Sequence, residues 1–145
     1  MSYKCFNVTI ENKIAHIKLS RPEKRNAMIE EFWHELPAVI RDIDDNAKAR
    51  VIVISSTGPI FSAGIDISML SGSVTGGGNK NVPDYGAAFY TTVKRLQASL
   101  SVLEECRIPV IAAIQGGCIG GGVDLVTACD MRYGTIDSYL TIFEI

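Results

Sequence analysis

The chain has 145 residues, of which 47% are hydrophobic and 21% are charged, and its formal net charge at pH 7 is −2. This composition is ordinary for one globular domain that buries a core, and the charge balance argues against a nucleic acid as partner. No apolar run is long enough for a membrane span, and the N-terminal residues lack the pattern of a signal or transit peptide, so we expect a cytoplasmic protein.

The first predicted element is a β-hairpin. Apolar and polar side chains alternate over residues 6–11 and again over residues 14–19, which predicts two strands that share one buried face. A basic, turn-rich loop, RPEKRNAM (21–28), follows. Residues 28–45 then carry apolar side chains at helical spacing, and Pro37 is expected to kink or split that helix.

Two further strands are predicted on either side of a second long helix. Residues 50–56, RVIVISS, form an apolar, β-branched run, which is typical of a strand that is covered on both faces. Residues 71–81 are of low complexity and are expected to form a mobile surface loop. The helix is predicted from Pro83 to about Cys106 and the next strand in PVIAAIQG (109–116).

The C-terminal third is predicted to contain a short helix in GGGVDLVTAC (120–129) and strands in MRYGTI (131–136) and SYLTIF (138–143). Strands that alternate with helices after a hairpin indicate an α/β fold with a largely parallel core, which we assign to one domain, 1–145.

Several polar residues and cysteines have structural interpretations. The four cysteines are scattered without a CxxC pair and only two histidines are present, so no metal site is expected. Cys118 and Cys129 are interpreted as small buried hydrophobes. Trp33 lies on the apolar face of the first helix and is expected in the core, whereas Asp130 and Arg132 are expected to have structural roles.

The stretch GGCIGGGVD (116–124) combines five glycines with one acid. It fits neither the GxGxxG fingerprint nor a Walker loop, which argues against nucleotide binding. A glycine-lined turn before a helix presents free N–H groups that attract negative charge. The loop Ala63-Gly64-Ile65, after the other parallel strand, could aim a second N–H at the same place. Two donors and an acid suit chemistry α to a carbonyl, and two simple tight turns are the alternative.

The motif FSAGID (61–66) followed by PVIAAIQGGCIGGGVDLVTACD (109–130) resembles the crotonase superfamily of enoyl-CoA hydratases and isomerases, and this resemblance covers the whole chain. It implies a spiral of ββα units that binds an acyl-CoA thioester, needs no separate cofactor and assembles as a homotrimer or hexamer when full length. It also implies a C-terminal helical part that is absent from this sequence, so we expect an N-terminal core portion that is inactive by itself.

The resemblance also implies roles for individual residues. The backbone N–H groups of Ile65 and Gly121 correspond to an oxyanion hole. The loop Ala63–Ile67 would lie along the CoA adenine, and the loop Arg25–Met28 along the pantetheine and phosphates, with Lys24 or Arg25 supplying positive charge. Contacts with CoA are therefore expected at Arg25, Ala27, Ala63, Gly64, Asp66 and Ile67. Asp66 is also expected to cap a helix that starts at Ile67.

Asp124 and Glu144 occupy two of the few positions whose acids set the reaction type in this family. A hydratase of the family typically has glutamate at both, and the motif around Asp124 looks most like dienoyl-CoA isomerases, which move a 3,5-diene to a 2,4-diene in fatty-acid β-oxidation. Asp124 is expected to be partly dry, with neighbouring acids that push its pKa away from theirs. The alternatives are a 2-enoyl-CoA hydratase and a non-catalytic acyl-CoA-binding fragment.

Overall fold

A five-stranded sheet forms the centre of the fold in the computed structural model, which describes residues 3–72 and 82–142. Its strand order is β1-β2-β3-β4-β6. The first two strands pair antiparallel, and β2, β3, β4 and β6 pair parallel. The predicted α/β class, with an opening hairpin and a parallel core, is confirmed. The strands are β1 (Phe6–Glu11), β2 (Ile14–Leu19), β3 (Val51–Ser56), β4 (Val110–Ile114) and β6 (Met131–Gly134).

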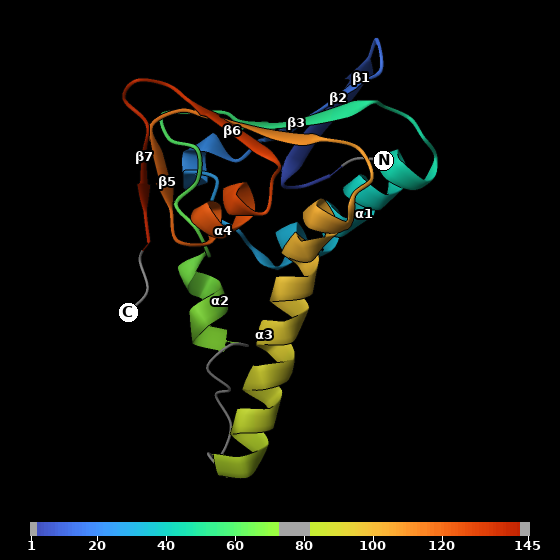
Figure 1. The fold of residues 1–145 in the computed structure, drawn as a ribbon. Helices are drawn as coiled ribbons and strands as arrows, with labels where there is room; N and C mark the ends of the chain where they lie inside the picture. The colour runs from blue at the N-terminus through green and yellow to red at the C-terminus, as the bar shows by residue number, and fades with distance from the viewer. Residues whose placement is uncertain (1–2, 73–81, 143–145) are drawn as a thin grey trace.

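The hairpin has the two strands that the alternation predicts, joined by Asn12 and Lys13, both at positive φ. Alternate residues of β2 are fully buried, so its predicted core face is confirmed. The same face of β1 is buried at Phe6, whereas Ile10, next to the turn, is 38% exposed. The burial fades because the tip of the hairpin projects beyond the helices (Figure 1).

Three helices lie on one side of the sheet in Figure 1: α1 (Glu30–Asp45), α3 (Val82–Glu105) and α4 (Gly121–Thr127). The expected split at Pro37 is wrong, because α1 continues through it, whereas the expected kink stays a prediction. A proline removes one backbone hydrogen bond inside a helix, and apolar packing on both sides of Pro37 offsets that loss. The residues that α1 buries are Phe32, Trp33, Leu36, Val39, Ile40 and Ile43.

The sheet is covered less evenly than its sequence indicates. In β3, Ile52 and Ile54 are buried under the helices, whereas Val51 and Val53 on the opposite face are only partly buried. The expectation of a strand covered on both faces is therefore wrong for this chain. The apolar composition of β3 does not distinguish its two faces, since both carry β-branched side chains.

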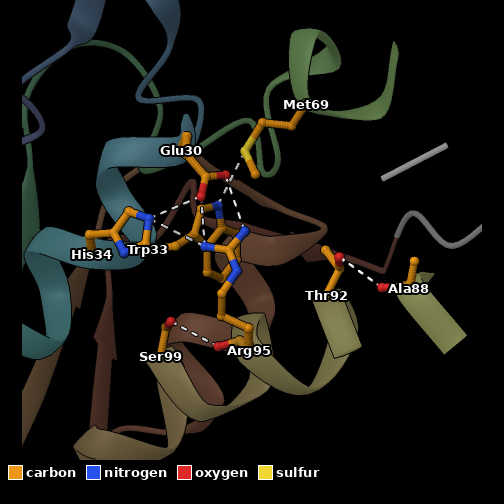
Figure 2. A network of polar contacts seen from close by, with 8 residues as sticks. All are labelled: Glu30, Trp33, His34, Met69, Ala88, Thr92, Arg95 and Ser99. Atoms are coloured by element: carbon orange, nitrogen blue, oxygen red, sulfur yellow. Dashed lines mark hydrogen bonds and ion pairs between the residues drawn. The ribbon is translucent and has the colours of Figure 1, made fainter. Parts of the chain in front are cut away.

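The helix α3 is confirmed, but only its C-terminal half reaches the core. Leu103 is buried there, whereas Phe89 and Tyr90 are exposed on the half that extends away from the sheet (Figure 1). An ion pair of 2.6 Å between Arg95 and Glu30 joins α3 to α1 (Figure 2), and the hydrogen bond from Arg95 lowers the pKa of Glu30. Exposed pairs of this kind contribute less than about 1 kcal/mol.

The short helix α2 (Ile67–Gly72) is anchored to α1 as well. The indole N–H of Trp33 donates to the sulfur of Met69 at 3.3 Å (Figure 2). Trp33 is buried, as predicted. Residues 71 and 72, expected in a loop, form the end of α2, and the rest of that expected loop lies outside the described residues.

Candidate functional site

A second, two-stranded sheet carries one half of the site. It consists of β5 (Gly117–Ile119) and β7 (Tyr139–Thr141), which pair parallel, and Ser62 forms an isolated bridge to Cys118 of β5. The strand in SYLTIF was predicted. In contrast, β5 was not predicted, because three residues beside glycines are too few to show the alternation of apolar and polar side chains that indicates a strand. The role of β5 is to lead the chain from β4 to the glycines at the start of α4.

The two loops that were expected to hold CoA lie side by side and are hydrogen-bonded to each other. The N–H of Ala63 donates to the carbonyl oxygen of Arg25 at 2.9 Å. A parallel bridge then joins Met28 to Ile65: the N–H of Met28 donates to the oxygen of Gly64 at 2.8 Å, and the N–H of Asp66 donates to the oxygen of Met28 at 2.9 Å. These segments, far apart in the sequence, therefore form one unit.

Asn26 fixes the shape of the first of these loops. Arg25 and Asn26 both have positive φ, a conformation that asparagine tolerates better than most residues. The Asn26 side chain is 3% exposed, accepts from the N–H of Arg21 at 2.9 Å and donates to the oxygen of Thr57 at 2.7 Å. Sequence reasoning gave Asn26 no separate role, although an asparagine in a turn-rich loop is a recognisable signal for such a position.

The N–H groups of Ile65 and Gly121 are brought together. The carbonyl of Gly64 accepts from Met28, and because a trans peptide is planar, the N–H of Ile65 points the opposite way. A Cβ on Gly121 would lie 3.6 Å from the nitrogen of Ile65, and a Cβ on Gly64 would lie 3.2 Å from the nitrogen of Gly121. Among the described residues, neither N–H donates a hydrogen bond. Both donors are thus available to a ligand.

Gly120 turns the chain into α4. Its φ of 50° and ψ of −120° are strained for any residue with a Cβ, and its N–H is held by the oxygen of Thr141 in β7 at 2.9 Å. After this turn Gly121 is the first residue of the helix, where an N–H has no intrahelical partner. The local conformation therefore requires a glycine at 120 and leaves the next N–H groups without a helical acceptor.

Asp124 lies in the first turn of α4, three residues after Gly121, which places the two on neighbouring positions of one helix face. The expectation that Asp124 is partly dry is wrong for this chain, because the residue is exposed. The helical period directs Leu125 and Val126 into the core and leaves Asp124 outside. Glu144, the other expected acid, lies outside the described residues.

Asp66 caps α2, as predicted. Its Oδ1 accepts from the N–H of Ser68 at 3.0 Å and from the Ser68 hydroxyl at 2.6 Å. These hydrogen bonds are the main cause of the lowered pKa of Asp66, to which Arg21 and Lys24 add. The same loop exposes 80% of Ile67, while Lys24 and Arg25 are exposed on the loop that is hydrogen-bonded to it. The site thus has cationic and apolar surface beside the two N–H donors.

The Asp66→Ala variant is expected to lose about 0.5–2 kcal/mol of unfolding free energy, because α2 loses its cap. Because the pKa of Asp66 is lowered by folding, its charged form stabilises the fold at pH values above the ordinary pKa of 3.8. This stabilisation is lost as the pH falls through the lower pKa of the folded state. Urea unfolding from pH 7 to pH 3 measures this. The difference from wild type should be constant down to about pH 5 and shrink below pH 4. A constant difference at all pH values would contradict the charged cap, and Asp66→Asn, which keeps an acceptor, is the control.

The remaining sequence interpretations concern structure. Cys118 and Cys129 are buried, and burial raises the pKa of each thiol to about 12. Asp130 accepts from the N–H of Val110 at 2.7 Å, and Arg132 donates to the oxygen of Cys129 at 2.7 Å, so both have structural contacts. Over residues 3–72 and 82–142, no cluster of three or more His, Cys, Asp or Glu could hold a metal ion. Within the same residues, no helix has the length and apolarity to cross a bilayer.

The chain has clear relatives of known name. It is 41% identical to the mitochondrial Δ(3,5)-Δ(2,4)-dienoyl-CoA isomerase of Homo sapiens and 39% identical to that of Rattus norvegicus, in each case over 99% of this chain and 44% of the relative. The peroxisomal protein of the same name from Arabidopsis thaliana is 39% identical over 99% of this chain and 53% of its own length. The chain thus spans about half the length of these relatives.

Solved structures share the fold. An enoyl-CoA hydratase from Mycobacterium smegmatis matches with a TM-score of 0.79 and 26% identity over 94% of this chain and 49% of its own. A Thermobifida fusca protein solved in complex with acetoacetyl-CoA matches with a TM-score of 0.77 and 34% identity over 94% and 52%. The expected crotonase-type α/β fold is confirmed. Since the sequence model of the enoyl-CoA hydratase/isomerase family matches residues 9–142, the chain belongs to that family.

Proposed function

We propose that the protein isomerises a 3,5-dienoyl-CoA to the 2,4-dienoyl-CoA in fatty-acid β-oxidation. The observation that carries this proposal is the convergence of the N–H groups of Ile65 and Gly121 from two separate loops. Asp124, in the first turn of the helix that begins with Gly121, adds an acid to that pair. The identity of about 40% to proteins named dienoyl-CoA isomerase supports this reaction over others of the family.

In the proposed reaction, the thioester oxygen accepts hydrogen bonds from Ile65 and Gly121. A carboxylate takes a proton from C2, and the electron pair of the broken C–H bond is delocalised onto that oxygen as an enolate conjugated with the 3,5-diene, which the two N–H groups stabilise. An acid then returns a proton to C6, and the double bonds move to C2 and C4. Asp124 and Glu144 are the proposed proton carriers. Coenzyme A is part of the substrate, and no cofactor takes part.

The CoA portion is proposed to lie over the paired loops. Lys24 and Arg25 supply positive charge for its phosphates, Ala27 leaves space for the pantetheine, and the second loop contacts the adenine through Ala63, Gly64, Asp66 and Ile67. The bound acetoacetyl-CoA of the Thermobifida fusca relative supports an acyl-CoA ligand. The chain spans about half the length of its relatives, and we propose that the full-length protein forms a homotrimer or hexamer.

The compartment stays a prediction. Four free cysteines fit the reducing cytoplasm that the sequence favours. The names of the relatives point to two organelles: those from Homo sapiens and Rattus norvegicus are called mitochondrial, and the one from Arabidopsis thaliana is called peroxisomal.

An absorbance assay tests the proposed reaction. The complete protein, incubated with a 3,5-dienoyl-CoA, should increase the absorbance of the conjugated 2,4-dienoyl product. Water addition to a 2-enoyl-CoA without this increase would identify a hydratase instead. Calorimetric binding of an acyl-CoA without either reaction would identify a non-catalytic binding module.

A further inference from the structure

Ser62 is a buried serine whose hydroxyl joins the two loops of the site. The residue is 0% exposed. Its hydroxyl donates to the carbonyl oxygen of Asn26 at 2.9 Å, and the Oγ of Ser62 itself accepts from the N–H of Gly64 at 3.1 Å. One side chain therefore connects the loop that carries Arg25 and Ala27 to the loop that carries Ile65.

The backbone of Ser62 also binds β5, the strand that leads to Gly121. Its carbonyl oxygen accepts from the N–H of Ile119 at 3.0 Å, in the strand that leads to Gly121. Its Cβ lies 3.1 Å from the place where a Cβ on Gly122 would sit. Ser62 thus contacts the first loop, the second loop and the start of α4 at once.

The peptide that presents the Ile65 N–H is held by this arrangement. Gly64 is fixed at its nitrogen by Ser62 and at its oxygen by Met28. Because the peptide between Gly64 and Ile65 is planar, these two contacts set the direction of the Ile65 N–H. A displacement of Asn26 would be transmitted through the Ser62 hydroxyl to Gly64.

We propose that Ser62 is a positioning residue that couples CoA contacts at Arg25–Met28 to the orientation of the Ile65 N–H. The inference rests on the proposed acyl-CoA site. Binding energy from the part of the substrate that does not react would then stabilise negative charge on the thioester oxygen. The consequence is that a substrate without the nucleotide loses stabilisation of the enolate as well as affinity.

Enolate formation on bound acetoacetyl thioesters measures this coupling without turnover. The C2–H bond breaks, the proton goes to solvent, and the electron pair moves to the oxygens, which gives a new ultraviolet absorbance. At saturation, the wild-type protein should hold a larger enolate fraction of acetoacetyl-CoA than of acetoacetyl-N-acetylcysteamine, which lacks the nucleotide. In Ser62→Ala the ratio of the two enolate constants should fall about two- to tenfold, the worth of one hydrogen bond.

Ser99→Ala is the matched control, because Ser99 is also buried, at 6% exposure, and its hydroxyl bonds the oxygen of Arg95 in α3. It should keep the wild-type ratio. Equal ratios in Ser62→Ala and wild type would overturn the proposal, as would equal enolate fractions for both thioesters in wild type, a result that needs no variant to fold. A bound enolate without dienoyl isomerisation would instead overturn the proposed function and leave the role of Ser62 intact.

Discussion

Replacing Gly64 with alanine is expected to lower kcat of the complete protein by about 10²–10³-fold, the effect of losing one oxyanion donor. A Cβ at this position would lie 2.8 Å from the carbonyl oxygen of Ile119 and 3.2 Å from the nitrogen of Gly121. Both neighbours are backbone atoms and cannot rotate away. The φ of 86° adds strain of about 1–3 kcal/mol for any residue with a side chain.

Alanine at position 64 would therefore push the loop and the start of α4 apart, and the N–H groups of Ile65 and Gly121 would no longer converge. The kinetics of dienoyl isomerisation, together with urea unfolding, measure the two effects separately. Gly86→Ala is the control: Gly86 lies inside α3, and its Cβ would meet nothing within 4 Å. That variant should keep its activity and gain about 0.5–1 kcal/mol, as alanine does in a helix. Wild-type activity in Gly64→Ala would contradict the proposed donor pair.

Long periodic segments of the sequence predict their own structure well. The hairpin and the two long helices follow from alternation or helical spacing over many residues, and β3 and β4 follow from β-branched runs between turns. Such signals are repeated along each element, so a single exception such as Pro37 does not remove them. The boundaries of α1 and α3 therefore agree closely with those expected.

Tertiary pairing decides the features that sequence reasoning missed. The three residues of β5 form a strand because β7 and Ser62 supply partners, and nothing in GCI itself requires it. Asn26 is buried because three backbone groups bond its amide, one from Arg21 in its own loop and two from Thr57 and Ile60 in the loop after β3. Most of these partners are more than twenty positions away, which a local pattern does not contain.

The same distinction between local patterns and tertiary packing applies to the candidate site. The loops and glycines were found because their residue types are unusual at strand ends, and the hydrogen bonds between Arg25–Met28 and Ala63–Asp66 account for their association. The environment of Asp124 was not found, because burial of a side chain in a seven-residue helix depends on what packs against it. An apolar sequence around an acid indicates a core beneath the helix and says little about its outer face.

Asp124→Asn is expected to lower the rate of dienoyl isomerisation by about 10²–10⁴-fold, because the amide can neither take nor return a proton. The change keeps the shape of the side chain, and Asp124 is exposed in the first turn of α4, so the unfolding free energy should fall by no more than about 1 kcal/mol, the value of a negative charge at a helix N-terminus. The measurement is kcat with a 3,5-dienoyl-CoA, together with calorimetric affinity for acetoacetyl-CoA, which should change little.

Asp137→Asn is the matched control, since Asp137 is exposed on the turn that precedes β7 and has no role in the proposed reaction. A rate for Asp124→Asn within about tenfold of wild type would remove this residue from the chemistry, because general acid–base catalysis is worth more than that.

Asp124→Glu then separates the two reactions of the family. If the shorter acid favours isomerisation, Asp124→Glu should have a lower isomerase rate. Its rate of water addition to a 2-enoyl-CoA should rise relative to that isomerase rate. An unchanged ratio of the two rates would mean that the choice of reaction is made by residues other than Asp124.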